Sequence, residues 1–217
     1  MHLKTFTKNY QLYLLPVSHS GIQLGNLVWK PFWGAPKLSH PGMPNHLSNA
    51  FYDVGILNQS SWKKWMKRFD QPLCENAELA KIKIKKASRA AGALLDALGL
   101  DYEKAYVLQA EISDLCAKVM DNALRVELDR YLEQLNQKSL RDLFRNPRKV
   151  CLITELYYGS FKLRVEKQHE FEVEQRIKAN KWPLEIQLDS DSEHVYAFTP
   201  NELPFAYKME RILGFNG

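Results

Sequence analysis

Cysteine and histidine are the residues of this chain best suited to hold a metal ion or to act in nucleophilic catalysis. The three cysteines, Cys74, Cys116 and Cys151, lie far apart in the sequence, and none belongs to a CxxC pair. Of the six histidines, only His40 and His46 are close together, in a proline-rich segment with no third ligand nearby. Ordinary loop histidines are therefore expected there, and no metal site is predicted.

A nucleophilic role for Cys151 would require an exposed, ionised thiol. The residue lies inside the apolar run VCLI at 150–153, so a buried and unreactive cysteine is expected instead. The chain also lacks a phosphate-binding glycine loop, a GxSxG motif and an HExxH motif. No pair of carboxylates stands out, so we expect no enzymatic activity and no cofactor.

Basic residues form a more informative pattern, and the formal net charge of +5 is compatible with an anionic partner, either phospholipid or nucleic acid. Lys81, Lys83 and Lys85 alternate strictly with the apolar residues Ile82 and Ile84, which predicts a strand with two unlike faces. Such a strand could line a water-filled pore with its isoleucines in lipid. It could equally be a sheet edge protected by lysine, and that is the simpler interpretation of this segment taken alone.

A second basic segment precedes this strand. Ser60 or Ser61 predicts the start of a helix that ends near Phe69. Four large apolar residues share one face of this helix at helical spacing, while basic residues crowd the other. The apolar face consists of Trp62, Trp65, Met66 and Phe69, and the basic face of Lys63, Lys64, Lys67 and Arg68.

Aromatic residues also cluster in the proline-rich segment 31–44 and just before it. Trp29, Phe32 and Trp33 could form an exposed interaction loop or the small core of that loop. We favour the core, because tryptophan is mostly buried in proteins.

The remaining pattern places strands on both sides of a helical middle section. Strands are expected at 10–17, 22–30 and 102–112, a short helix at 88–98, and a long helix from Ser113 to Leu135. The buried stripe of the long helix would be Leu115, Val119, Ala123, Val126, Leu132 and Leu135. A helical turn at 139–144 precedes strands at 150–158, 161–166, 171–174, 184–188, 195–198 and 205–213. This order predicts a single α+β domain over 1–217, with a twisted, mostly antiparallel sheet and packed helices.

Nothing in the sequence predicts a membrane-spanning helix or a secretory signal. The longest apolar stretch, at 90–100, is interrupted by Asp96 and is about half of the roughly 20 residues that a spanning helix needs. The N-terminus lacks the apolar core of a signal peptide. A cytoplasmic protein is therefore expected.

The last third of the chain has a recognisable order of strands. The segment VCLITEL at 150–156 runs into the charged, alternating FKLRVEK at 161–167, and a return strand follows. The chain then closes on a proline and FAYKM at 205–209. This order resembles the second half of a gasdermin pore-forming domain, where a "VVTEV"-type strand continues into a long hairpin and an "LAFRV"-type strand closes the sheet. The predicted helix at 113–135 takes the place of that domain's middle helices, and segments 80–86 and 102–112 that of its first membrane-inserting hairpin.

The resemblance covers about residues 79–215 and implies a gasdermin N-terminal-domain-like fold. No C-terminal repressor domain is expected, and no cysteine near the N-terminus corresponds to the one that some bacterial members acylate. The chain is therefore most similar to minimal, single-domain gasdermin-like proteins, including those of fungal allorecognition.

The resemblance also implies a function: oligomerisation on acidic phospholipid membranes and pore formation that drives lytic cell death. The protein would move from the cytoplasm to the cell membrane on activation and would be a dimer, or bound to a partner, while soluble. The basic residues expected to bind lipid are Lys4, Lys8, Lys63, Lys64, Lys67, Arg68, Lys81, Lys83, Lys85 and Lys86. The apolar residues expected in the inserting strands are Ile82, Ile84, Val107, Phe161, Leu163, Val165, Leu184, Ile186 and Leu188.

A rival hypothesis remains open from the residues themselves. The lysine-rich strand and the helix at 62–69 could belong to a non-enzymatic binding module for nucleic acid or for a protein partner. If the protein forms pores, nucleic acid is not expected among its partners. Liposome leakage separates this hypothesis from pore formation.

Overall fold

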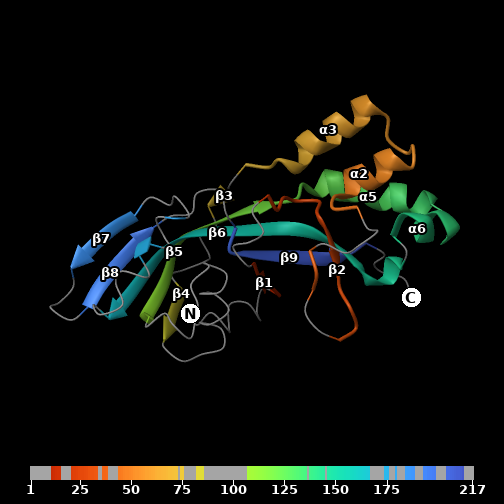
Figure 1. The fold of residues 1–217 in the computed structure, drawn as a ribbon. Helices are drawn as coiled ribbons and strands as arrows, with labels where there is room; N and C mark the ends of the chain where they lie inside the picture. Colours follow the sequence, from red (N-terminus) through yellow and green to blue (C-terminus); the bar gives the residue numbers. More distant parts are fainter. Residues whose placement is uncertain are drawn as a thin grey trace. The chain divides into compact units, whose positions relative to one another are not determined.

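The protein is a mixed α/β structure with an antiparallel sheet and several helices (Figure 1). This computed structural model describes residues 11–15, 21–33, 36–38, 44–72, 74–75, 82–85, 107–135, 137–144, 146–166, 174–175, 179, 184–188, 193–198 and 204–212. The coarse fold class predicted from the sequence, α+β with a mostly antiparallel sheet, is confirmed over these residues.

The strands vary greatly in length. The short strands are β1 (Tyr13–Leu14), β2 (Leu27–Trp29), β3 (Cys74–Glu75) and β4 (Ile82–Lys85). Two are much longer, β5 (Val107–Val119) and β6 (Val150–Glu166), and they are followed by β7 (Leu184–Leu188), β8 (Glu193–Phe198) and β9 (Ala206–Arg211). The helices are α2 (Leu47–Asp53), α3 (Gln59–Phe69), α5 (Asn122–Gln134) and α6 (Gln137–Phe144), with a 3₁₀ turn, η1 (Pro147–Lys149).

The residues group into two compact units, each built from three stretches of the chain. Unit 1 consists of Met1–Gly21, Cys74–Ala117 and Tyr157–Tyr207, and unit 2 of Ile22–Leu73, Lys118–Leu156 and Lys208–Gly217. Among the described elements, unit 1 contains mainly strands, whereas all the helices labelled in Figure 1 belong to unit 2.

Strand β6 is central in the sheet, as its apolar sequence predicts. It neighbours β5 and β9, and it also pairs with β2 and β8. Its first nine residues, 150–158, are almost all buried, with only Glu155 partly exposed. The strand continues without interruption through Gly159 to Glu166, so the two strands expected at 150–158 and 161–166 are one.

The long helix predicted from Ser113 to Leu135 is confirmed over Asn122–Gln134 and wrong before that. Residues up to Val119 are strand, and helix α5 begins only at Asn122, where the Asp121 side chain accepts a hydrogen bond from the Ala123 backbone N–H. Two members of the expected buried stripe, Val119 and Val126, are about half exposed, at 48% and 51%. The residues of α5 that are buried are Leu124, Leu128 and Leu132.

A local irregularity in β5 explains this error. Asp114 has a left-handed φ of 51°, and the buried residues Ile112 and Leu115 are separated by two residues instead of one. One extra residue shifts the alternation of a strand, as a β-bulge does. The resulting spacing of three from Ile112 to Leu115 also fits the period of a helix.

The helices of unit 2 are joined by an aromatic cluster and by ion pairs. Trp65 of α3 contacts Tyr131 of α5 edge-on, with ring centroids 5.2 Å apart, and Phe51 of α2 lies 5.7 Å from Trp65. Beside this cluster, Arg68 forms an ion pair with Glu127 of α5. These contacts fix the orientation of α3, which has its two buried residues, Trp65 and Phe69, towards the core.

Most of the other predicted elements are confirmed. Helix α3 forms where expected, although its cap is Asn58, which accepts from the Ser61 N–H, and not a serine. Strands β4, β7, β8 and β9 lie within or close to the predicted ranges. The strand expected at 171–174 is wrong at its last position, because Glu174 is helical, and the helix expected at 88–98 lies outside the described residues.

Candidate functional site

A three-stranded ribbon of unit 1 brings together six of the nine apolar residues nominated as membrane-inserting. Strand β8 pairs with β6 on one side and β7 on the other, both antiparallel. Since alternate residues of a strand share a face, the register places three rows of residues on one face. They are Phe161, Leu163 and Val165 of β6, His194, Tyr196 and Phe198 of β8, and Leu184, Ile186 and Leu188 of β7.

The other face of this ribbon carries most of its charge. It consists of Lys162, Arg164 and Glu166 of β6, Glu193, Val195 and Ala197 of β8, and Glu185 and Gln187 of β7. On the apolar face, Phe161, Leu163 and Tyr196 are buried in this structure. The Phe161 ring meets Phe205 edge-on at 5.8 Å. The ribbon is therefore two-faced, and the described part of its apolar face is covered.

Strands β4 and β5 form a second two-faced pair in unit 1. Their register sets Ile82 against Ile112 and Ile84 against Ala110, all on one face. On the other face Lys83 stands opposite Glu111 and Lys85 opposite Gln109. The alternation of lysine and isoleucine in β4 is thus matched by β5, where polar and apolar residues alternate in the same phase.

Not every nominated residue joins these faces. Val107 has the parity of Gln109 and Glu111 in β5, so it falls on the polar side of the β4–β5 pair and not with Ile82 and Ile84. Lys4, Lys8, Lys81 and Lys86 lie outside the described residues.

The basic side of α3 is largely as the sequence predicts. Lys63, Lys64 and Lys67 are exposed. Arg68 differs from them, because it is half-buried and pairs with Glu127 and, at 3.8 Å, with Asp121. Arg68 is therefore already engaged within unit 2.

The expected small core around Trp29, Phe32 and Trp33 is wrong for two of the three residues. Trp33 is 91% exposed and Phe32 75%, whereas Trp29 is partly buried. We call residues 31–38 the aromatic loop, of which 31–33 and 36–38 are described. Mutual backbone hydrogen bonds between Trp29 and Lys37, both 2.8 Å, close this loop and hold it as a projection. Of the two interpretations, the structure therefore supports an exposed loop at Phe32 and Trp33.

Positive charge surrounds the base of the aromatic loop. The Lys149 ammonium lies 5.0 Å from the Phe32 ring centroid and 5.5 Å from that of Trp29. Lys30 is tied to Lys149 by a 2.7 Å backbone hydrogen bond, and Lys37 and Arg148 are exposed. A tip with two exposed aromatic rings is thus flanked by basic side chains.

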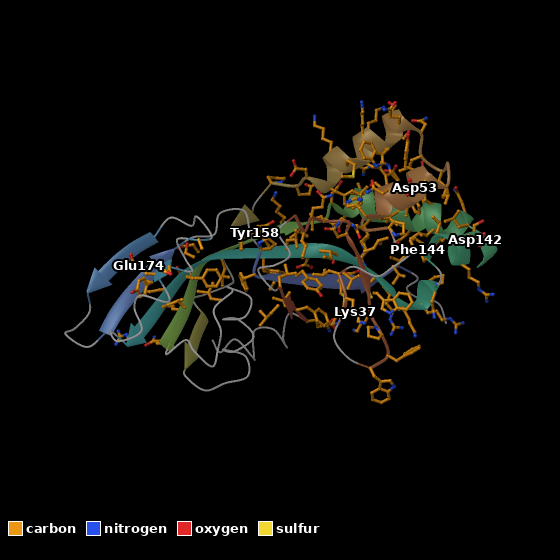
Figure 2. The ribbon with its side chains drawn as sticks, in the orientation of Figure 1. Lys37, Asp53, Asp142, Phe144, Tyr158 and Glu174 are labelled. Atoms are coloured by element: carbon orange, nitrogen blue, oxygen red, sulfur yellow. The ribbon has the colours of Figure 1, made fainter. Side chains whose placement is uncertain are left out.

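Within unit 2, the aromatic loop and α3 lie on opposite sides of the strands. Figure 1 shows α2, α3 and α5 together on one side of β2 and β9, and the loop that follows β2 on the other. In Figure 2, Lys37 on the loop and Asp53 at the end of α2 are likewise separated by the strands. Two basic surfaces of unit 2 therefore point in different directions.

His46 and Cys151, the candidates for metal binding and for catalysis, are both buried. His46 is buried, its Nδ1 accepts from the Ser48 N–H at 3.1 Å, and its Nε2 lies 3.0 Å from the Leu24 carbonyl oxygen. Burial lowers the pKa of His46 to about 4, although the bond to Leu24 opposes this. Cys151 is buried as expected, and its burial raises the pKa of the thiol. Within the described ranges, no three His, Cys, Asp or Glu side chains come together to hold a metal ion.

No family model matches the chain, and neither does any curated protein. Of the helices described here, none is both long enough and apolar enough to cross a membrane.

Proposed function

We propose that this chain is a pore-forming protein with a gasdermin-like fold, which assembles on membranes containing acidic phospholipid and inserts two strand regions of unit 1. The observation that carries the proposal is the common register of the ribbon β6–β8–β7. Six residues nominated from the sequence share one face of it, and charged residues predominate on the other. In a cell, such a pore would cause lysis.

The physical argument is that strands in a pore wall must serve two solvents. Residues facing lipid must be apolar and those facing the lumen polar, alternating along each strand. Adjacent strands must alternate in the same phase, or charged residues would enter lipid. In the β4–β5 pair, apolar residues stand opposite apolar residues and polar ones opposite polar ones. The ribbon β6–β8–β7 keeps the same phase with two exceptions in β8, since His194 stands on the apolar face and Val195 on the charged one.

Strand length also favours the proposal. A strand needs about 9–11 residues to cross the hydrocarbon core of a bilayer. The parts of β6 and β5 that belong to unit 1, 157–166 and 107–117, have 10 and 11 residues, so both reach that length before any rearrangement. Strands β4 and β7, with 4 and 5 residues, would have to lengthen on insertion.

The aromatic loop supplies a way to reach the membrane. Tryptophan and phenylalanine partition into the interfacial region of a bilayer, and nearby lysine and arginine attract acidic headgroups, each by about 1 kcal/mol. Trp33 and Phe32 are exposed beside Lys37, Arg148 and Lys149. We propose that this surface makes the first contact, before the strands of unit 1 refold.

Dye release from vesicles tests the proposal. The purified protein should empty phosphatidylcholine vesicles that contain phosphatidylserine and spare vesicles of phosphatidylcholine alone. Equal release from both would refute the electrostatic part, and release from neither would refute pore formation in favour of a binding module.

Paired variants test the docking surface. Replacing both Phe32 and Trp33 by serine removes two exposed rings, so folding should be unaffected while vesicle binding weakens. If insertion buries most of both rings, the loss is about 3 kcal/mol, or roughly a hundredfold in affinity. The matched control replaces Tyr52 and Val54 by serine; these are also exposed, at 44% and 50%, but lie with the helices of unit 2. Control and loop variants that weaken binding equally would show that the loop has no special role.

A further inference from the structure

The outer face of α3 is a second basic surface, which the docking proposed above does not use. Lys63, Lys64 and Lys67 fall within about a third of the helix circumference, at 3.6 residues per turn. They lie opposite the buried residues Trp65 and Phe69, and all three are exposed. Within the described part of the chain, their side chains make no hydrogen bond, ion pair or ring contact. We call these three residues the lysine face.

The charges at the C-terminal end of α3 are already paired within unit 2. Arg68, at its C-terminal end, pairs with the carboxylates of Glu127 and Asp121. Asp70, just after the helix, pairs with Lys118 at 3.5 Å. The charges at the end of α3 that borders α5 are thus paired, whereas the described residues place no carboxylate on the lysine face.

Aromatic and apolar side chains lie where α2 meets the first turn of α3. The Trp62 and Tyr52 rings lie 6.0 Å apart at an angle of 49°, and the Trp62 indole N–H donates to Asn49 at 2.9 Å. Tyr52 is 44% exposed and Val54 50%. Aromatic anchors beside charged residues are typical of protein–protein interfaces.

The direction of this surface decides between a lipid and a protein partner. Basic and aromatic residues together would also suit a bilayer. In unit 2, however, α3 and the aromatic loop lie on opposite sides of the strands, so one flat membrane cannot contact both (Figure 1). This step rests on the proposed function, in which the aromatic loop is the surface that meets the bilayer.

We propose that the lysine face, together with Tyr52 and Val54, binds an acidic segment of a second polypeptide. Lys63 and Lys67 are one helical turn apart, which matches carboxylates spaced four residues apart on a helical partner. Because all three lysines are solvated, they contribute mainly to association rate and to salt-dependent affinity. A partner bound there leaves the aromatic loop free. Such a partner can hold the protein in solution, or it can remain attached while the loop contacts the membrane.

A crossed experiment with two charge-matched variants tests this assignment. One variant replaces Lys63, Lys64 and Lys67 by glutamine, and the other replaces Lys30, Lys37 and Arg148 by glutamine. Each is measured by fluorescence anisotropy with a labelled peptide that carries glutamate at every fourth position on an alanine background. Each is also measured for binding to phosphatidylserine-containing vesicles without the peptide.

The lysine-face variant should bind the peptide about tenfold more weakly than the wild type, from three solvated charge pairs, and should bind vesicles as the wild type does. The second variant should show the reverse. If both variants lose the peptide equally, the attraction is non-specific and the assignment is wrong. If the lysine-face variant loses vesicles and keeps the peptide, α3 is a membrane surface and the assignment is also wrong.

The two proposals fail separately in this design. Peptide binding is measured without lipid, so a protein that never permeabilises vesicles can still show loss of the peptide on substitution of the lysine face. Conversely, a wild-type protein that ignores the peptide but empties vesicles would overturn only the assignment of α3.

Discussion

Replacing His46 by asparagine should make the protein less sensitive to acid. His46 precedes α2, and its Nδ1 accepts the Ser48 N–H, so the remaining proton is on Nε2, which donates to the Leu24 carbonyl. The imidazole is 1% exposed and lies edge-on to the Phe69 ring, with centroids 4.8 Å apart. A second proton would have to enter at Nδ1, where it would remove the acceptor for Ser48 and place a charge in this apolar site.

The sign and size of the effect follow from the pKa of His46, which falls from 6.5 to about 4 on folding. As the pH falls, the unfolded chain therefore takes up a proton at His46 before the folded protein does. The stability that neutral His46 gives to the folded protein is fully present above pH 6.5 and is lost as the pH falls towards 4. Between about pH 7.5 and about pH 4.5 the loss amounts to about 2.5 kcal/mol, at 1.36 kcal/mol per unit of pKa.

The assay is urea unfolding of both proteins at these two pH values, followed by circular dichroism. Asparagine can still cap α2 by accepting the Ser48 N–H, but it cannot reach Leu24. The variant should therefore be less stable near neutrality by about 1–2 kcal/mol. Carboxylates titrate alike in both proteins. The loss of unfolding free energy between the two pH values in the wild type, minus the same loss in the variant, is therefore the effect of His46. Equal losses in the wild type and the variant would refute the reasoning.

Two further predictions concern backbone strain and the alternating strand. Gly25→Ala should lower the unfolding free energy by at least about 2 kcal/mol, because φ is 85° and a β-carbon would lie 2.5 Å from His46 Nε2. Gly55→Ala, at φ 77° with nothing within 4 Å, should cost only about 1 kcal/mol, and similar costs in urea titrations would contradict the role of that contact. Ile84→Lys places a charge on the lipid side of the proposed pore, at about 2–4 kcal/mol per subunit, and should abolish vesicle leakage. Lys83→Gln should leave leakage intact and change only charge selectivity. A thermal melt must first show that both variant proteins fold. If folded Ile84→Lys protein empties vesicles at the wild-type rate, β4 does not belong to the pore wall.

Several elements were predictable from the sequence because their signals are local. The alternation at 82–85 and at 184–188 gives the strands β4 and β7, and the spacing of Trp65 and Phe69 gives the buried side of α3. Cys151 could be expected to be buried because the residues on both sides of it are apolar. In each case the residues within one or two turns or pleats determine the outcome.

The candidate site was only partly predictable. The sequence identifies amphipathic strands one at a time, but the common phase of β6, β8 and β7 depends on their register, which is set by pairing between distant segments. The exposure of Trp33 could not be predicted from the sequence either, because burial depends on whether another part of the chain covers the ring. The average tendency of tryptophan to be buried led to the wrong expectation.

The helix wrongly predicted at 113–119 shows what only the tertiary structure decided. The residues that follow Ile112 have a helical spacing because Asp114 adds one residue to a strand. That strand is held by close approach to β6, where a β-carbon on Gly159 would lie 2.8 Å from Ile112 Cγ2 and 3.0 Å from the Ser113 carbonyl oxygen. The sequence by itself determined the two-faced character of the strands and the apolar centre of the sheet. Pairing with β6 on one side and with β3 at 116–117 on the other decided that residues 113–119 are strand, because the same apolar spacing suits a helix when no neighbouring strand is present.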